Sequence, residues 1–316
     1  MVPGAVAAGL VLLALGYGEL RTAGIARASA EAPALRVGVV QANLGLMEKR
    51  TQGVLGHRRH LAQTRELLAE GPLDLVVWPE TAYVRGLRRP LPLDGQPIRE
   101  DLTVPLLFGG TSVWEEGGRR VSANSALLVA ADGAIRDAYD KNLLIPLAEF
   151  APFAGVVPRV AALFPHVQDF RAAGATPPLR LGALRIATPI CYEAVRPDFV
   201  RRMVREVRPH LIVTLANDAW FGDSQEPWIH LALTRLRAIE HRLWLVRATN
   251  SGVSAVVDPA GRVVARTGLL TRENLRAVVH PREARTLYTR LGDWPGGLAV
   301  ALTVLGLSVR RGIKGA

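Results

Sequence analysis

The sequence predicts an α/β fold in which helices cover the faces of β-sheets. Two observations carry this prediction: apolar runs of strand length alternate with helix-like segments, and turn-forming residues separate them. Short apolar runs bounded by turn residues are typical of buried strands. Strands that alternate with helices form layered α/β domains. The 316 residues allow one large domain or two small ones, with a substantial core.

The expected elements follow in chain order. Strands are expected within 35–43, 73–80, 104–114, 122–140, 210–220 and 243–266. Hairpin turns are expected at ADG (131–133) and at DPAG (258–261). The polar stretch 53–70 predicts a surface helix, and the stretch 179–193 leads into a helix that starts near Pro197, a favoured first helical position. A further helix is expected at 228–242.

Both ends of the chain are apolar and predict membrane-spanning helices. Residues 2–18 carry no charge, and at about 1.5 Å per residue such a run only just spans a bilayer core of about 30 Å. The uncharged run 294–309 precedes a basic tail, which favours a cytoplasmic C-terminus. The expected organisation is a transmembrane helix at 1–22, a central domain at 33–285, and a transmembrane helix at 290–310 with a basic cytoplasmic tail at 310–316.

Each apolar end also has a second interpretation. The N-terminal run resembles a secretory signal with a cleavage site at ASA (28–30), although it lacks a basic start. The C-terminal run is also compatible with a buried terminal helix. We favour two spans, which would place the central domain on the outer side of the membrane.

The chain is strongly basic, with a formal net charge of +11 and a pI near 10.8. We expect no nucleic-acid partner, because the arginines are spread through many segments and the sequence contains no zinc-finger spacing or RNA-binding signature. Basic residues close to a membrane are attracted to anionic phospholipid. The mean hydropathy of +0.17 is high for a soluble enzyme. Proximity to a membrane accounts for both the charge and the hydropathy.

Three residues at the ends of apolar runs form a candidate catalytic set. Cys191, the only cysteine, follows one such run, and Glu80 and Lys141 follow two others. A carboxylate can accept the thiol proton, and an ammonium can stabilise the oxyanion that forms when a thiolate attacks a carbonyl. Each residue also has a structural interpretation: free cysteine is commonly buried in cores, and the other two would be ordinary surface charges. None of the seven histidines lies in a recognisable catalytic motif.

Ordered motifs around these three residues carry a family resemblance. WPET, YDKNLLIPLAEFAPF and PICYEA resemble the glutamate, lysine and cysteine motifs of the nitrilase superfamily. The finer match is to the bacterial apolipoprotein N-acyltransferases. It is carried in order by KNLLIPLAEFAPF, CYE, NDAWFG, RATNSGVSAVVDP and LYTRLGDWP, within residues 35–309. Several motifs in the right order are much more specific than any one of them.

The resemblance implies a nitrilase-like αββα sandwich as the catalytic domain, on the periplasmic side of the inner membrane. Cys191 would take an acyl chain from a phospholipid donor as a thioester. The N-terminal amine of a diacylglyceryl-cysteine apolipoprotein, the acceptor, would then collect it. Glu80 carries over as general base and Lys141 as oxyanion stabiliser.

The resemblance also implies supporting residues. Glu149 and Glu193 would support the site, and the backbone N–H of Tyr192 would donate to the oxyanion. Trp220 and Phe221 are either core aromatics or a wall of the acyl pocket. We expect no cofactor and no metal, because the sequence contains neither a metal-ligand cluster nor a phosphate-binding loop.

Two further segments have open interpretations. The apolar stretch 151–164 is either a core helix or a lipid-facing lid, and His230 is expected to be structural. The chain also departs from the family in having one expected span before the catalytic domain, where the family has several, and in lacking a tryptophan near Arg50. Three interpretations are open: a split enzyme whose partner is a separate multi-helix membrane subunit, a truncated sequence, or a diverged short form.

Two alternatives use the same residues differently. A nitrilase-type hydrolase would resolve the thioester with water and release ammonia from a small amide. A non-catalytic membrane subunit would bind lipid or lipoprotein, although such a role gives no reason for Glu80, Lys141 and Cys191 to occur together.

Overall fold

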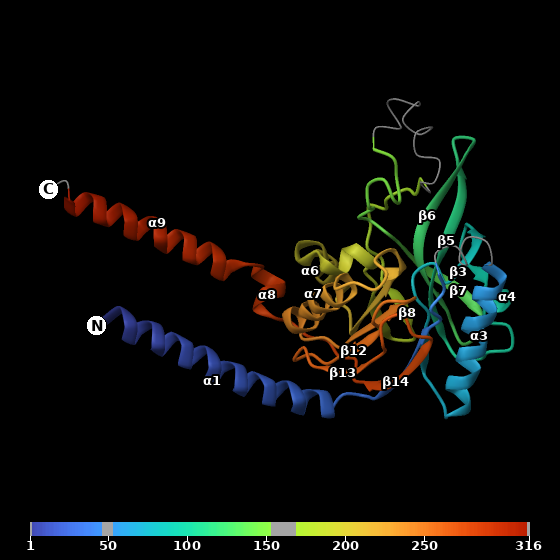
Figure 1. Cartoon of the computed structure of the whole chain (residues 1–316), viewed down its shortest axis with the longest axis horizontal. Helices are drawn as coiled ribbons and strands as arrows, with labels where there is room; N and C mark the ends of the chain where they lie inside the picture. Colours follow the sequence, from blue (N-terminus) through green and yellow to red (C-terminus); the bar gives the residue numbers. More distant parts are fainter. Residues whose placement is uncertain (1, 46–52, 153–168, 315–316) are drawn as a thin grey trace.

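A computed structural model describes residues 2–45, 53–152 and 169–314. Two β-sheets pack face to face, and helices cover both outer faces, as Figure 1 shows. The expected α/β sandwich with αββα layers is confirmed. The apolar stretch 151–164 from residue 153 onward and the segment around Arg50 lie outside the described residues, so the expected lid or core helix and the position of the absent tryptophan stay predictions.

The first sheet contains eight strands. They are β1 (Leu35–Gln41), β2 (Leu75–Val77), β3 (Tyr83–Arg88), β4 (Leu93–Asp94), β5 (Leu106–Glu116), β6 (Arg119–Val129), β7 (Ala134–Asp140) and β14 (Glu273–Val279). Their order is β14-β1-β2-β5-β6-β7-β4, and β3 also pairs with β5. Strands β1, β2 and β5 are parallel, whereas β5, β6 and β7 form an antiparallel meander. The expected turn at ADG joins β6 to β7.

The second sheet contains six strands. They are β8 (Leu179–Leu181), β9 (Leu184–Ala187), β10 (Leu211–Ala216), β11 (Leu245–Thr249), β12 (Ala255–Val257) and β13 (Val263–Arg266), in the order β13-β12-β11-β10-β9-β8. Strands β9, β10 and β11 are parallel, so their carboxyl ends meet at one edge. The expected DPAG turn joins β12 to β13, which pair antiparallel.

The helices of the sandwich lie on its two outer faces. They are α3 (Gly53–Ala69) and the short α4 (Gln96–Arg99) beside the first sheet, and α6 (Pro197–Val207), α7 (Glu226–His241) and α8 (Leu287–Leu291) beside the second. Two short 3₁₀ turns, η1 (Cys191–Val195) and η2 (Asp218–Trp220), follow β9 and β10. Pro197 opens α6 as expected, because its fixed φ suits the first helical turn.

Two apolar clusters hold the layers together. The larger cluster fills the space between the sheets and extends to α6 and α7, with Val39, Leu128, Val213 and Phe199 among its members. The smaller cluster packs α3 against the outer face of the first sheet. Glu80, Lys141 and Cys191 each lie shortly after a strand of the two sheets, so the packed sandwich fixes where these three residues lie.

The two terminal helices project from the sandwich in the same direction (Figure 1). Helix α1 (Val2–Ala30) extends past the expected boundary at residue 22, and its Gly4–Ala30 part is long and apolar enough to cross a membrane. Helix α9 (Trp294–Lys314) has a shorter apolar part, Trp294–Gly306. Helix α1 is therefore a candidate membrane span, and the C-terminal span stays a prediction.

Candidate active site

Cys191 begins the turn that follows strand β9 of the second sheet. Ile190, just before it, bridges to Leu215 of β10, so the thiol lies where parallel strands end. Its backbone has φ +52°, in the left-handed region that costs a non-glycine residue roughly 1–3 kcal/mol. The side chain is 9% exposed. Such strain persists only when the surrounding structure holds it, and it is common at functional sites.

Glu80 and Lys141 come from the first sheet and meet in one buried ion-pair cluster. Glu80 follows β2, and Lys141 follows β7. Lys141 Nζ lies 3.4 Å from Glu80 Oε1 and 2.8 Å from Glu149 Oε1. Asn124, on β6, donates from Nδ2 to the same two oxygens at 2.7 and 2.9 Å. The carboxylates of Glu80 and Glu149 therefore share two buried donors, Lys141 Nζ and Asn124 Nδ2.

The thiol of Cys191 lies within the electrostatic field of this cluster. Burial raises its pKa far above the ordinary value, the negative charge of Glu80 raises it further, and the positive charge of Lys141 opposes both. The thiol therefore rests protonated at neutral pH, and forming the thiolate requires a base. The three predicted residues lie close enough to act on one another, although they are far apart in the sequence.

Lys141 is held in its charged form. Burial alone lowers its pKa, but the negative charges of the Glu80 and Glu149 carboxylates oppose this, and the net shift is upward. An ammonium that stays charged in a site with little water is well suited to stabilise negative charge that develops on a bound carbonyl oxygen.

Glu193 joins the segment of Lys141 to that of Cys191. Its Oε1 accepts the N–H groups of Asn142 and Leu143, just after Lys141, at 2.5 and 3.0 Å. Its Oε2 accepts the Ile190 N–H at 2.8 Å and the Tyr139 hydroxyl at 2.7 Å. Burial raises the pKa of Glu193 to about 7, although these four donors oppose the shift. One carboxylate thus fixes residues beside both candidate catalytic groups.

Aromatic side chains near the two turns are exposed to solvent. Trp220 is 57% exposed, Phe221 41% and Tyr192 42%. The interpretation of Trp220 and Phe221 as core aromatics is therefore wrong.

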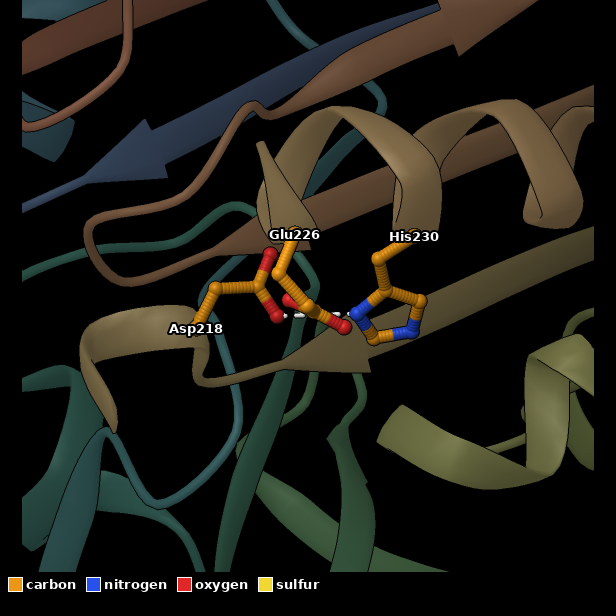
Figure 2. Close-up of side chains that lie close together, drawn as sticks. All are labelled: Asp218, Glu226 and His230. Carbon is orange, nitrogen blue, oxygen red and sulfur yellow. Dashed lines mark hydrogen bonds and ion pairs between the residues drawn. The ribbon is translucent and has the colours of Figure 1, made fainter. Parts of the chain in front are cut away.

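A second buried polar cluster lies behind Cys191. Figure 2 shows Asp218 of η2 and His230 of α7 joined by a hydrogen bond, with Glu226 beside them. His230 Nδ1 lies 2.9 Å from Asp218 Oδ1, and Asp218 Oδ2 accepts from Arg247 Nη2 at 2.7 Å. Oxygen and nitrogen atoms of Asp218, Glu226 and His230 lie within 4.8 Å of one another. Both Asp218 oxygens already form hydrogen bonds, to His230 and to Arg247, and a metal ion at this site would compete with those two bonds.

Three residues of these clusters were not expected from the sequence. Asn124 sits in an ordinary strand pattern, and nothing local distinguishes it. Asp218 lies in the NDAWFG motif, in which only Trp220 and Phe221 were expected to belong to the site. Arg247 lies within an apolar strand run and is fully buried. A buried arginine requires a charged or polar partner, so a charged residue in this run was the sequence signal that could have identified it.

Comparisons with known proteins agree with this architecture. The model of the carbon-nitrogen hydrolase family matches residues 36–287. Curated relatives include an apolipoprotein N-acyltransferase of Geobacter metallireducens, 32% identical over 78% of this chain and 48% of the relative. Another from Azotobacter vinelandii is 34% identical over 92% of this chain and 56% of the relative. The chain thus spans about half the length of these relatives.

A solved structure shows the same fold. The Saccharomyces cerevisiae Nit3 structure, described as a member of branch 10 of the nitrilase superfamily, has a TM-score of 0.60 and 16% identity. It covers 82% of this chain, and this chain covers 94% of it.

Proposed function

Because this chain belongs to the carbon-nitrogen hydrolase family, we propose that its buried Glu80, Lys141 and Cys191 perform acyl transfer through a cysteine thioester. The proposed donor is a phospholipid, and the proposed acceptor is the N-terminal amine of a diacylglyceryl-cysteine apolipoprotein. The observation that carries the proposal is a buried Glu80–Lys141 ion pair whose charges act on the buried thiol of Cys191. The curated relatives named apolipoprotein N-acyltransferase support it.

The first half-reaction forms the thioester. Glu80 takes the thiol proton as the sulfur of Cys191 attacks the ester carbonyl of the phospholipid. The tetrahedral intermediate collapses by breaking the bond between the carbonyl carbon and the glycerol oxygen. Glu80 returns the proton to that oxygen, and a lysophospholipid leaves. The raised thiol pKa makes this assisted removal of the proton necessary.

The second half-reaction forms the amide. The neutral amine of the acceptor attacks the thioester carbon, and Glu80 takes one of its protons. The carbon–sulfur bond then breaks, and the proton returns to the sulfur of Cys191. The products are an N-acylated lipoprotein and the free thiol, so the two half-reactions follow a ping-pong scheme.

The oxyanion in both steps is stabilised by Lys141 and by the backbone N–H of Tyr192. Lys141 stays charged because carboxylates surround it. Glu149 and Asn124 hold Lys141 and Glu80 in place through the bonds given above. Glu193 keeps the Lys141 and Cys191 segments in register.

The proposed lipid contact is made by exposed side chains beside the site. Trp220 and Phe221 would face the acyl chain. Helix α1 would anchor the domain on the periplasmic side of the inner membrane, with the basic tail of α9 in the cytoplasm. A separate multi-helix membrane subunit is a further proposed partner.

The proposal is tested by acyl transfer in vesicles. The full chain is incubated with phospholipid and a diacylglyceryl-cysteinyl peptide, with and without a membrane fraction that supplies further helices. Mass spectrometry should detect a triacylated peptide, which Cys191→Ala and Glu80→Gln should abolish. Glu283→Gln is the control, since this carboxylate is exposed and pairs with Arg185 away from the site. Acylation that persists without the thiol, or ammonia release from small amides in its place, would contradict the proposal.

A further inference from the structure

We propose that His230 is a positioning residue that orients the peptide group between Cys191 and Tyr192, so that the Tyr192 N–H points at the oxyanion. Asp218 and Arg247 hold His230 in place. This inference rests on the proposed function for the role of that N–H. It gives the buried cluster in Figure 2 a part in acyl transfer.

The contact that carries the inference joins His230 to the backbone of the nucleophile. His230 Nε2 lies 3.3 Å from the carbonyl oxygen of Cys191. That carbonyl and the Tyr192 N–H belong to one planar peptide group, so a bond that fixes the oxygen also fixes the direction of the N–H. Cys191 has a left-handed backbone, which needs such external support.

The Nδ1 side of the His230 ring is anchored by Asp218, and Asp218 is in turn held by Arg247. Asp218 Oδ1 bonds to His230 Nδ1, and its Oδ2 bonds to Arg247 on β11. All three side chains are at least nine-tenths buried. Burial raises the pKa of Asp218, but the charge of Arg247 and the bond from His230 lower it by more, so this group is a carboxylate. A buried ion pair on a central strand is a rigid anchor for the imidazole.

The two hydrogen bonds of His230 also determine what it does to the peptide group. Both ring nitrogens face oxygens that can only accept, namely a carboxylate and a carbonyl. The charged groups that face the ring are Asp218, Glu226 and, beyond Asp218, Arg247. A donated bond to the carbonyl polarises the peptide and strengthens the Tyr192 N–H as a donor.

Gly252 provides independent support for the importance of this geometry. A Cβ at residue 252 would lie 2.2 Å from Asp218 Oδ2 and 2.8 Å from its Cβ and Cγ. Only glycine allows Asp218 to sit where it reaches both His230 and Arg247. Gly252→Ala therefore disturbs the anchor without touching His230 or the nucleophile.

The experiment compares two reactions of the same thiol. Acylation of Cys191 by p-nitrophenyl butyrate passes through an oxyanion, whereas alkylation by iodoacetamide does not. For His230→Phe in the full chain we expect acylation kcat to fall about 10- to 100-fold. KM and the alkylation rate should stay within about threefold, because binding and thiol ionisation do not use the oxyanion donor. Gly252→Ala should lower the acylation-to-alkylation ratio in the same direction.

His241→Phe is the matched control. His241 lies on the same helix, is also buried, and bonds to Thr289 rather than to the site. It should lower the melting temperature but leave the ratio of the two rates unchanged. If His230→Phe does not fold, His230→Asn and Gly252→Ala are judged by the same ratio.

Two results would overturn the inference. One is an unchanged acylation rate in the His230 and Gly252 variants, and the other is an equal loss of acylation and alkylation, which would assign His230 to the thiol itself. Because the activated ester replaces phospholipid, failure of the chain to acylate lipoprotein would overturn the proposed function and leave this inference standing.

Discussion

Asn124 is the residue whose replacement tests the buried charge cluster most sharply. Its Nδ2 donates to Glu80 at 2.7 Å and to Glu149 at 2.9 Å, and the same carboxylates share Lys141. Asn124→Leu keeps the number and branching of the side-chain heavy atoms and removes both bonds. Asn124→Asp instead places a third carboxylate beside one ammonium.

The magnitude of each change can be worked from these contacts. Hydrogen bonds to charged groups contribute about 1.5–3 kcal/mol each, so Asn124→Leu loses about 3–6 kcal/mol. Leucine regains about 1–2 kcal/mol by burying apolar surface, which leaves a net loss of about 1–5 kcal/mol. For a domain of this size, that lowers Tm by about 2–20 °C. Asn124→Asp should cost more, because two unit charges 4 Å apart repel by about 4 kcal/mol at an effective dielectric constant of 20.

The assay measures Tm in detergent together with the rate of acyl-thioester formation. We expect the rate to fall about 10- to 100-fold in Asn124→Leu, because Glu80 loses its 2.7 Å bond to Asn124, one of the bonds that position it. Asn274→Leu is the control, since Asn274 bonds to Gln63 and Glu66 away from the site. The reasoning is refuted if Asn124→Leu keeps Tm within about 2 °C of the wild type and acylates within about twofold of its rate.

Two further predictions concern the close approach of Gly109 to Glu80 and the dependence of stability on pH. Gly109→Ala should abolish acylation, because the new Cβ would lie 2.6 Å from the Cα of Glu80. Gly110→Ala is the control: the nearest atom to its Cβ is 3.3 Å away, and this variant should acylate within about threefold of the wild-type rate. Equal acylation rates in the two variants would contradict the prediction. Burial and nearby arginines lower the pKa of His241 to about 3, so the unfolded state alone binds this proton between pH 6.5 and 3, and stability should fall with decreasing pH by about 1.4 kcal/mol per unit. Burial raises the pKa of Glu240 and Glu193 to about 7, so these groups have the opposite effect between pH 7 and 4.5, and the loss from His241 should show below about pH 4.5. Carboxylates with a lowered pKa, such as Asp218, also lose stability as the pH falls, so Tm should decrease less steeply in His241→Gln than in the wild type. A variant curve as steep as that of the wild type would count against this prediction.

Much of the fold follows from local patterning. The apolar runs at 35–43 and 210–220 became β1 and β10, and the polar stretch at 53–70 became α3, because burial on a sheet face and on one helix stripe leaves different periodicities. Strands β3 and β14 were not expected, since YVRGLR and ENLRAVV carry exposed charges and pair at or near sheet edges. Their pairing partners are distant in sequence and cannot be predicted locally.

The candidate site was only partly predictable, for a related reason. Glu80, Lys141 and Cys191 each follow an apolar strand, and strand ends converge in layered α/β folds. Asn124 and Arg247 lie inside strands, and their importance depends on which side chains the two sheets bring together. The exposure of Trp220 depends on where η2 turns the chain, which its aromatic type does not reveal.

The thioester itself provides the most direct test of the account. The full chain is incubated with phospholipid alone, and its intact mass is measured before and after hydroxylamine treatment. The account predicts one added acyl chain, localised to Cys191, removed by hydroxylamine and absent from Cys191→Ala. An acyl group found on another residue, or acyl transfer to the acceptor that proceeds without Cys191, would contradict it.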